Sequence, residues 1–167
     1  MDSDQYIINQ LINKFISQPV LIRGLIVADI QHYNPQDIFS LADMATNANG
    51  NKECYILTPP RRFVFVLPWF PVHRARNGYW KKDGYTDLEI YGNNGIVGVK
   101  QKFHFYEGGI NNGRKTNWYM IEYSLKEHCC SVTCDHENGR LENWVVCKIY
   151  QDFGPDHLTS EIQKLNI

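Results

Sequence analysis

Apolar and polar residues alternate with a period of two over residues 97–105, which predicts a β-strand with two unlike faces. The apolar face consists of Val97, Val99, Phe103 and Phe105, and the polar face of Gly98, Lys100, Lys102 and His104. A second strand is expected to end at Leu125, after a polar loop that contains glycine. One face of this pair can pack on a core while the other is basic. A basic sheet face suits an anionic partner, and nucleic acid is the commonest large one.

Helical spacing predicts a few helices around these strands. The apolar stripe of Asp4–Ser17 ends before Pro19, and Thr159–Leu165 predicts a short C-terminal helix. Asn34-Pro35 marks a turn before a helical turn at Gln36–Leu41. The apolar segment Val20–Ile30 fits either a helix or a strand.

Further short strands are expected at Cys54–Leu57, Leu88–Tyr91 and Trp144–Tyr150, with Thr46–Lys52 as a polar loop and Lys126–Asn143 as a charged connection. The apolar run Phe63–Phe70 has two interpretations. It is a strand buried in its own domain, or it is an exposed contact surface formed by Phe63, Phe65, Trp69 and Phe70. Large exposed apolar patches are rare on monomers, which favours the buried strand.

The composition narrows the class of protein. A length of 167 residues is most simply one domain, residues 1–167, and an aromatic content of 13% favours a packed β-rich domain. The net charge of −1 counts against DNA binding unless the cations gather on one face. We expect no signal peptide and no membrane contact, because the N-terminus lacks a basic start and no apolar run has the length of a membrane span.

Cysteine and histidine residues cluster late in the chain, at His128, Cys129, Cys130, Cys134 and His136. Structural zinc sites usually show paired spacings that this cluster lacks, so free thiols in a reducing compartment are expected and no metal is predicted. Nucleophile, phosphate-loop and metalloprotease motifs are also missing from the sequence. We therefore expect a protein that is not an enzyme and carries no cofactor.

Several motifs in one order resemble the NAC domain, a DNA-binding module of land-plant transcription factors. They are Gly78-Tyr79-Trp80-Lys81, Val97-Gly98-Val99-Lys100, Phe105-Tyr106-Glu107-Gly108, Lys115-Thr116-Asn117-Trp118 with Met120 and Glu122-Tyr123, and Trp144-Val145-Val146-Cys147. The resemblance is strong over residues 78–150 and weak over 4–77, and residues 151–167 form a C-terminal extension. Co-ordered motifs are more specific than any one motif alone.

This resemblance implies an α+β fold, a twisted antiparallel β-sheet flanked by a few helices. It also implies a nuclear transcription regulator that inserts the edge of a β-strand and its loop into the major groove of double-stranded DNA. The expected DNA-binding residues are Lys81, Lys82, Lys100, Lys102, Lys115, Arg114, Arg74, Arg76, His73 and Tyr79. Lysines and arginines hold phosphates, while groups that reach base edges provide sequence preference.

The sequence also departs from the family pattern. Asp83 and Asp87 stand where the family has Thr and Lys, and His73 stands where an Arg is expected. These changes favour an alternative, a NAC-like protein-interaction module that has lost DNA binding and modulates other transcription factors. Tyr6 occupies the place of a Glu used in the family's dimer, so we expect any homo- or heterodimer with NAC proteins to form through Phe63–Phe70 instead.

Overall fold

The computed structural model describes residues 3–15, 18–41, 45–46, 52–59, 64–66, 70–84, 87–93, 95–125 and 144–153. Within them the chain forms helices α1 (Ser3–Phe15) and α2 (Pro35–Leu41), the 3₁₀ turn η1 (Ile30–His32) and a ten-stranded sheet. The strands are β1 (Ile26–Val27), β2 (Ala45–Thr46), β3 (Lys52–Thr58), β4 (Val64–Val66), β5 (Phe70–Arg74), β6 (Gly78–Lys82), β7 (Leu88–Gly92), β8 (Gly95–Glu107), β9 (Arg114–Leu125) and β10 (Val145–Gln151).

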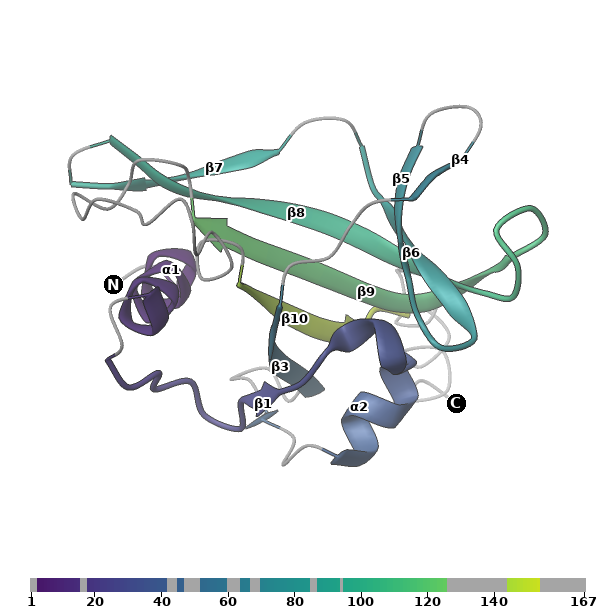
Figure 1. Ribbon diagram of the computed structural model, residues 1–167, viewed down its shortest axis with the longest axis horizontal. Helices are drawn as coiled ribbons and strands as arrows, with labels where there is room; N and C mark the ends of the chain where they lie inside the picture. Colours follow the sequence, from purple (N-terminus) through teal and green to yellow (C-terminus); the bar gives the residue numbers. More distant parts are fainter. Residues whose placement is uncertain are drawn as a thin grey trace, which may run out of the picture.

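The long hairpin of β8 and β9 is the middle of the sheet (Figure 1). Its strands pair antiparallel, with Lys100 opposite Tyr123 and His104 opposite Tyr119, as the period-two pattern predicts. The main path of the sheet runs β1-β3-β10-β9-β8-β6-β5-β4, while β2 pairs with β3 and β7 with β8. Every strand pairing among the described residues is antiparallel except the short one between β1 and β3. The expected strand over residues 97–105 and the expected strand that ends at Leu125 are therefore confirmed as an antiparallel pair.

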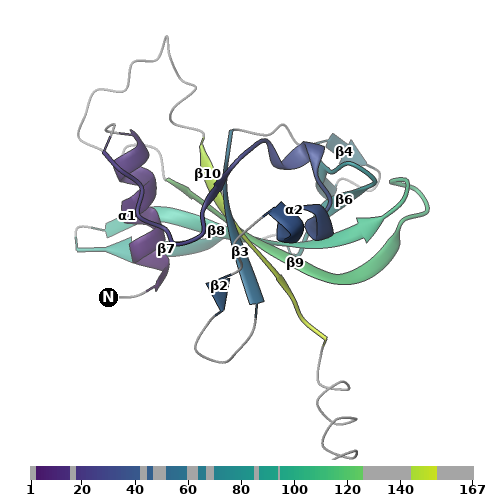
Figure 2. The ribbon, with the colours of Figure 1, turned by 90° about the horizontal axis from the view of Figure 1, so that it is seen from below.

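The sheet buries apolar side chains on both faces, because strands β3 and β10 stand between the two helices (Figure 2). Neighbouring residues of β3 belong to different apolar clusters: Ile56 lies in the cluster that contains Ile38 of α2, and Leu57 in the cluster of Ile8 in α1. Successive side chains of a strand point to opposite faces. We name these the α2 face and the α1 face. The first also buries Trp80, Phe103, Phe105, Met120 and Cys147, and the second buries Ile7, Leu11, Tyr123 and Val146.

Helix α2 begins with a local signal that the sequence carries. Pro35 occupies the first position of the helix, and Asp37 Oδ2 accepts a hydrogen bond from the Asn34 backbone N–H at 3.1 Å. The Asn34 side-chain oxygen accepts from the Asn77 backbone N–H at 2.8 Å. One residue thus begins the helix and also ties it to the turn between β5 and β6.

Two apolar regions take a form that the sequence left open or did not predict. Val20–Ile30, left open between helix and strand, contains only the two-residue strand β1 before η1 begins at Ile30. Phe63–Phe70 is not one strand, because β4 and β5 pair as a hairpin with Val64 opposite Val72. Prolines at 68 and 71 cannot donate to a ladder, which disfavours one continuous strand.

Some predictions fall on parts of the chain outside the described residues. These include Phe63 and Trp69, the connection 126–143 with its cysteine and histidine cluster, and the predicted helix at 159–165. For Phe65 and Phe70 the backbone alone is described. Among the described residues, neither helix has the length and apolar character needed to cross a lipid bilayer.

Gly98 allows α1 to approach β8 closely, and this contact predicts a measurable change in stability. A Cβ atom at Gly98 would lie 2.7 Å from the Ser124 carbonyl oxygen and closer still to Ile8 Cδ1. Gly98→Ala should therefore lower the free energy of unfolding by about 1–3 kcal/mol through overpacking, measured by urea denaturation. Adding Ile8→Val removes the clashing Cδ1 and should recover part of the loss. Two substitutions that destabilise additively would show that this contact does not limit the packing.

Candidate nucleic-acid interface

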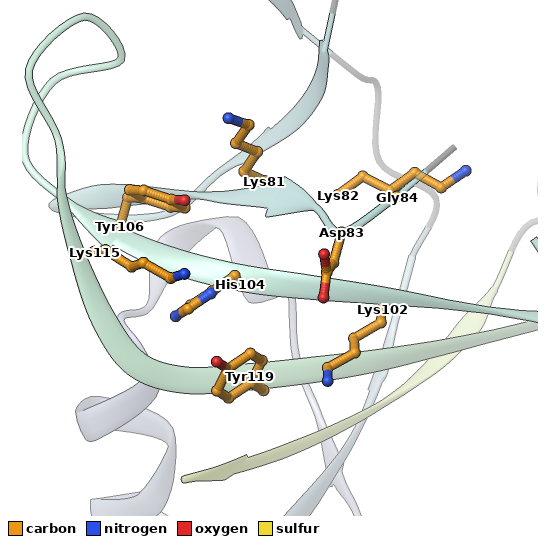
Figure 3. Close-up of a pocket in the computed structure, with 9 residues that line it drawn as sticks. All are labelled: Lys81, Lys82, Asp83, Gly84, Lys102, His104, Tyr106, Lys115 and Tyr119. Carbon is orange, nitrogen blue, oxygen red and sulfur yellow. The ribbon is translucent and has the colours of Figure 1, made fainter. Parts of the chain in front are cut away.

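Helix α1 covers only part of the α1 face, and the rest holds a basic pocket of about 280 Å³. We name this pocket the basic basin (Figure 3). Its lining comes from β6, β8, β9 and the two residues after β6: Lys81, Lys82, Asp83, Gly84, Lys102, His104, Tyr106, Lys115 and Tyr119. The lysines come from three different strands, so the fold gathers cations that are far apart in the sequence.

A bulge in the central hairpin brings Lys115 to this face. Register shifts between His104 and Tyr106, so that His104 pairs with Tyr119 and Tyr106 pairs with Lys115. Three residues of β9 therefore stand opposite Phe105 alone, as in an extended β-bulge. Thr116 stabilises the bulge, because its hydroxyl donates to the Phe105 carbonyl at 2.7 Å and accepts from the Trp118 N–H at 3.2 Å.

Aromatic rings lie between the cations of the α1 face. Lys102 Nζ lies 4.7 Å from the Tyr119 ring centroid, and Lys81 Nζ lies 5.8 Å from that of Tyr106. Tyr119 stacks at 5.8 Å on Tyr150 of β10, and Lys148 Nζ lies 5.8 Å from the Tyr150 ring. These contacts hold the lysine stems along the sheet and leave the ammonium groups near its surface.

His104 lies in the basin and is 6% exposed. Its Nε2 donates a hydrogen bond to the Thr116 carbonyl oxygen. Burial lowers the pKa of the imidazole and the nearby Lys115 and Lys102 lower it further, outweighing the opposite effects of the Thr116 hydrogen bond and Asp83. His104 is therefore neutral at pH 7, and the basin's positive charge comes from its lysines.

Two of the predicted DNA-binding lysines form ion pairs inside the protein. Lys100 Nζ lies 2.6 Å from Asp4 Oδ2 at the start of α1, and Asp4 Oδ1 also accepts from the Tyr123 hydroxyl at 2.9 Å. Lys82 Nζ lies 2.5 Å from Asp87 Oδ1, and its side chain is 11% exposed. Both lysines therefore have structural partners, one holding α1 on the sheet and the other holding Asp87, the residue directly before β7.

Asp87, a departure from the family pattern, is the acceptor of a small network. Gln101 Nε2 donates to the same Oδ1 at 2.8 Å. Burial raises the pKa of Asp87, but the hydrogen bonds from Lys82 and Gln101 outweigh it and hold that pKa below its ordinary value. Its charge is thus neutralised within the chain.

The remaining predicted residues lie away from the basin or below the surface. Arg74 and Arg76 line a second pocket with the turn at Gly108–Ile110, and Arg76 lies 3.9 Å from Asp37. Arg114 Nη2 lies 2.6 Å from Glu107 Oε2. His73 is 2% exposed, beside the Phe103 ring and 3.6 Å from Glu122 Oε2, and so does not face solvent. Tyr79 is 6% exposed and stacks on Tyr106 at 5.2 Å, which braces β6.

The sequence analysis missed several members of this surface. Lys148 and Tyr150 belong to it because β10 pairs with β9, and Lys148 is further held 3.2 Å from Glu53 Oε2. Alternation along β10, where Lys148 lies between Cys147 and Ile149, could have placed Lys148 on the polar face. Alternation along β8 and β9 also places Tyr106 and Tyr119 on this face, although aromatic residues in strands usually belong to a core.

Comparison with known proteins identifies relatives of this chain. The family described as No apical meristem (NAM) protein matches residues 2–125. NAC transcription factor 32 of Arabidopsis thaliana is 36% identical over 151 residues, which cover 90% of this chain and 56% of that protein. NAC domain-containing protein 2 of Solanum lycopersicum is 32% identical over 148 residues, which cover 89% of this chain and 51% of that protein.

The chain therefore belongs to the NAM family, whose domain is the NAC domain. It spans about half the length of the curated relatives it matches. The family match ends at residue 125, but β10 continues the same sheet by pairing with both β3 and β9.

Lys100 and Lys102 allow a matched test of the structural ion pair, because both lie on the α1 face of β8. Lys100→Ala should lower the free energy of unfolding by about 1–3 kcal/mol, since it removes the cation that lies 2.6 Å from the partly buried Asp4 carboxylate. Lys102→Ala should change it by about 0.5 kcal/mol or less, because no described carboxylate lies within 4.0 Å of Lys102 Nζ. Equal losses in urea denaturation would contradict this assignment.

Titration of His104 predicts a pH dependence with a defined sign. Its pKa is lower in the folded protein than in the unfolded chain, where it is about 6.5, so the unfolded chain binds the proton first as pH falls. The stability that neutral His104 provides is present above about pH 6.5 and is lost as pH falls through the folded pKa. The stability difference between wild type and His104→Gln should therefore be larger at about pH 7.5 than at about pH 5. A difference independent of pH would contradict the assignment.

Proposed function

We propose that this protein binds double-stranded DNA through the basic basin and acts as a transcription regulator in the nucleus. The observation that carries the proposal is the open half of the α1 face, where Lys81, Lys102 and Lys115 gather beside aromatic rings. Among the described residues, no carboxylate lies within 4.0 Å of the Lys102 or Lys115 ammonium group. The names of the relatives, which are NAC transcription factors, support the same role.

The spacing of the strands suits a phosphate backbone. Neighbouring strands lie about 4.8 Å apart, so lysines on β6, β8 and β9 span roughly 10 Å across the sheet. This distance is comparable with the Debye length of about 8–10 Å at physiological salt, so the charges act together on one stretch of duplex. The overall charge of −1 does not prevent this, because carboxylates such as Asp87 and Asp4 are neutralised within the chain by Lys82 and Lys100.

The end of β6 is the element that we propose to enter the major groove, which admits a strand pair. Lys81 lies on this strand, and Asp83 and Gly84 follow it at the edge of the basin. Phosphate contacts from Lys102 and Lys115 would set the register of the protein on the duplex, while groups at the end of β6 would reach base edges. The whole of residues 1–167 would act as one such domain.

Salt dependence of duplex binding tests this division of roles. Lys102→Ala and Lys115→Ala should each weaken binding on all duplexes and reduce the slope of log affinity against log salt by about one unit. Lys100→Ala, compared under conditions where it remains folded, should leave that slope unchanged because its charge is already paired with Asp4. Fluorescence anisotropy between about 50 and 200 mM salt measures the slope. Equal slopes for all three variants would remove the basin from the mechanism.

A second candidate function is a protein-interaction module without DNA binding, which modulates other transcription factors. The observation that favours it is the pairing of Lys82, Lys100, Arg114 and Lys148 with carboxylates of the same chain. Homo- or heterodimers with NAC proteins would then use the segment that contains Phe65, Trp69 and Phe70.

The two candidates differ in duplex binding and in the salt response of association. Tyr6, in the place of the family's dimer residue, donates its hydroxyl hydrogen to the Leu21 carbonyl at 2.6 Å within the chain. The interaction module predicts no duplex binding near 50 mM salt, together with self-association that persists at high salt and is lost in Trp69→Asp. Sedimentation of wild type and Trp69→Asp, with circular dichroism to verify folding, separates loss of association from loss of fold.

A further inference from the structure

Among the described residues that line the basic basin, Asp83 is the one carboxylate. It follows the last residue of β6, and its backbone N–H donates to the Lys102 carbonyl at 2.7 Å, which extends the pairing of β6 with β8 by one residue. The backbone of Asp83 is therefore fixed, while its side chain is exposed. Figure 3 shows its carboxylate directed over the basin, between Lys81 on one side and Lys102 on the other.

The groups around this carboxylate are mainly cations and hydrogen-bond donors. None of the described lysines of the basin lies within 4.0 Å of Asp83, so the carboxylate is not neutralised by a direct ion pair there. It acts at longer range, since its charge adds to the raised pKa of Tyr150 and partly opposes the lowered pKa of His104, both of which are set mainly by burial. Asp83 is thus a hydrogen-bond acceptor in the basic basin, among lysines whose charge attracts phosphate.

The chemistry of the carboxylate limits what it can meet on a duplex. It accepts hydrogen bonds and cannot donate them, so it repels phosphates and the acceptor atoms of guanine and thymine in the major groove. Adenine offers an amino group beside its N7 acceptor, whereas cytosine offers its N4 amino group without an adjacent acceptor. A carboxylate at the groove edge therefore favours cytosine over the other three bases.

We propose that Asp83 is a specificity-determining residue that accepts a hydrogen bond from the N4 amino group of a cytosine in the major groove. This inference rests on the proposed function, because it requires the end of β6 to lie against a duplex. Lys81, Lys102 and Lys115 attract the DNA phosphates on either side of Asp83, and this attraction outweighs the repulsion between Asp83 and phosphate. The carboxylate of Asp83 then selects the base that it faces. The matching residue in the family pattern is Thr, whose hydroxyl both donates and accepts hydrogen bonds. It therefore discriminates less between bases.

The test begins with selection of preferred duplexes from a randomised library by the wild-type protein, at about 50–100 mM salt. The selected site should contain one C·G pair whose replacement weakens binding by about five- to 100-fold. Asp83→Asn should abolish that preference or change it toward adenine, which an amide can contact in two places. Asp83→Thr should relax the preference for the C·G pair. Lys102→Ala should weaken binding to all duplexes by the same factor and leave the preference intact.

A modified base isolates the proposed hydrogen bond. N4-methylcytosine keeps its Watson–Crick pair but replaces the amino hydrogen that faces the major groove. At the selected position it should weaken wild-type binding by the same factor as Asp83→Asn, and the variant should not distinguish the two bases. Circular dichroism of Asp83→Asn verifies the fold, which the exposure of this side chain should leave unchanged.

Two other results would overturn the inference, and they are distinguishable. Asp83→Asn could raise affinity by one factor on every duplex without altering base preference, and Asp83 would then be a repulsive charge only while the DNA interface remains. Alternatively, neither wild type nor variant could bind any duplex near 50 mM salt, and the proposed function would fail together with the base contact.

Discussion

The ion pair between Asp4 and Lys100 determines which part of the α1 face is closed. Asp4 lies at the start of α1, and its two carboxylate oxygens contact both strands of the central hairpin, through Lys100 of β8 and Tyr123 of β9. Gly98, without a side chain, lets Ile8 of the same helix approach β8. Helix α1 therefore covers the half of the face near Gly98 and leaves open the half near His104, where the basic basin lies.

This arrangement sorts the cations into two groups by their partners and not by their number. Lys82 and Lys100 are held by Asp87 and Asp4, and they organise the fold. Lys102 and Lys115 lie in the open basin, supported by a bulge and by a tyrosine ring. An overall charge near zero is thus compatible with a surface that attracts anions, because a charge that is paired within the chain contributes little to the field outside it.

Sequence patterns predicted the sheet better than they predicted the site. Period-two alternation correctly assigned the two strands of the central hairpin, because successive side chains of a strand point to opposite faces. It could not show that Lys100 meets Asp4, because that contact joins residues that are 96 positions apart. It also could not foresee that His73 is buried beside Phe103, or that the bulge at Thr116 turns Lys115 toward His104. Contacts of this kind depend on the register between strands, which composition does not fix.

Amide hydrogen exchange on the free protein and on its complex with a duplex tests the central claim most directly, because it reports protection along the whole chain. The account predicts that a duplex protects residues 81–84, 102–106 and 115–119, which surround the basin, and leaves the amides of β7 unchanged. Protection confined to β7, or to the turns that contain Arg74, Arg76 and Gly109, would contradict the assignment of the basin as the nucleic-acid interface.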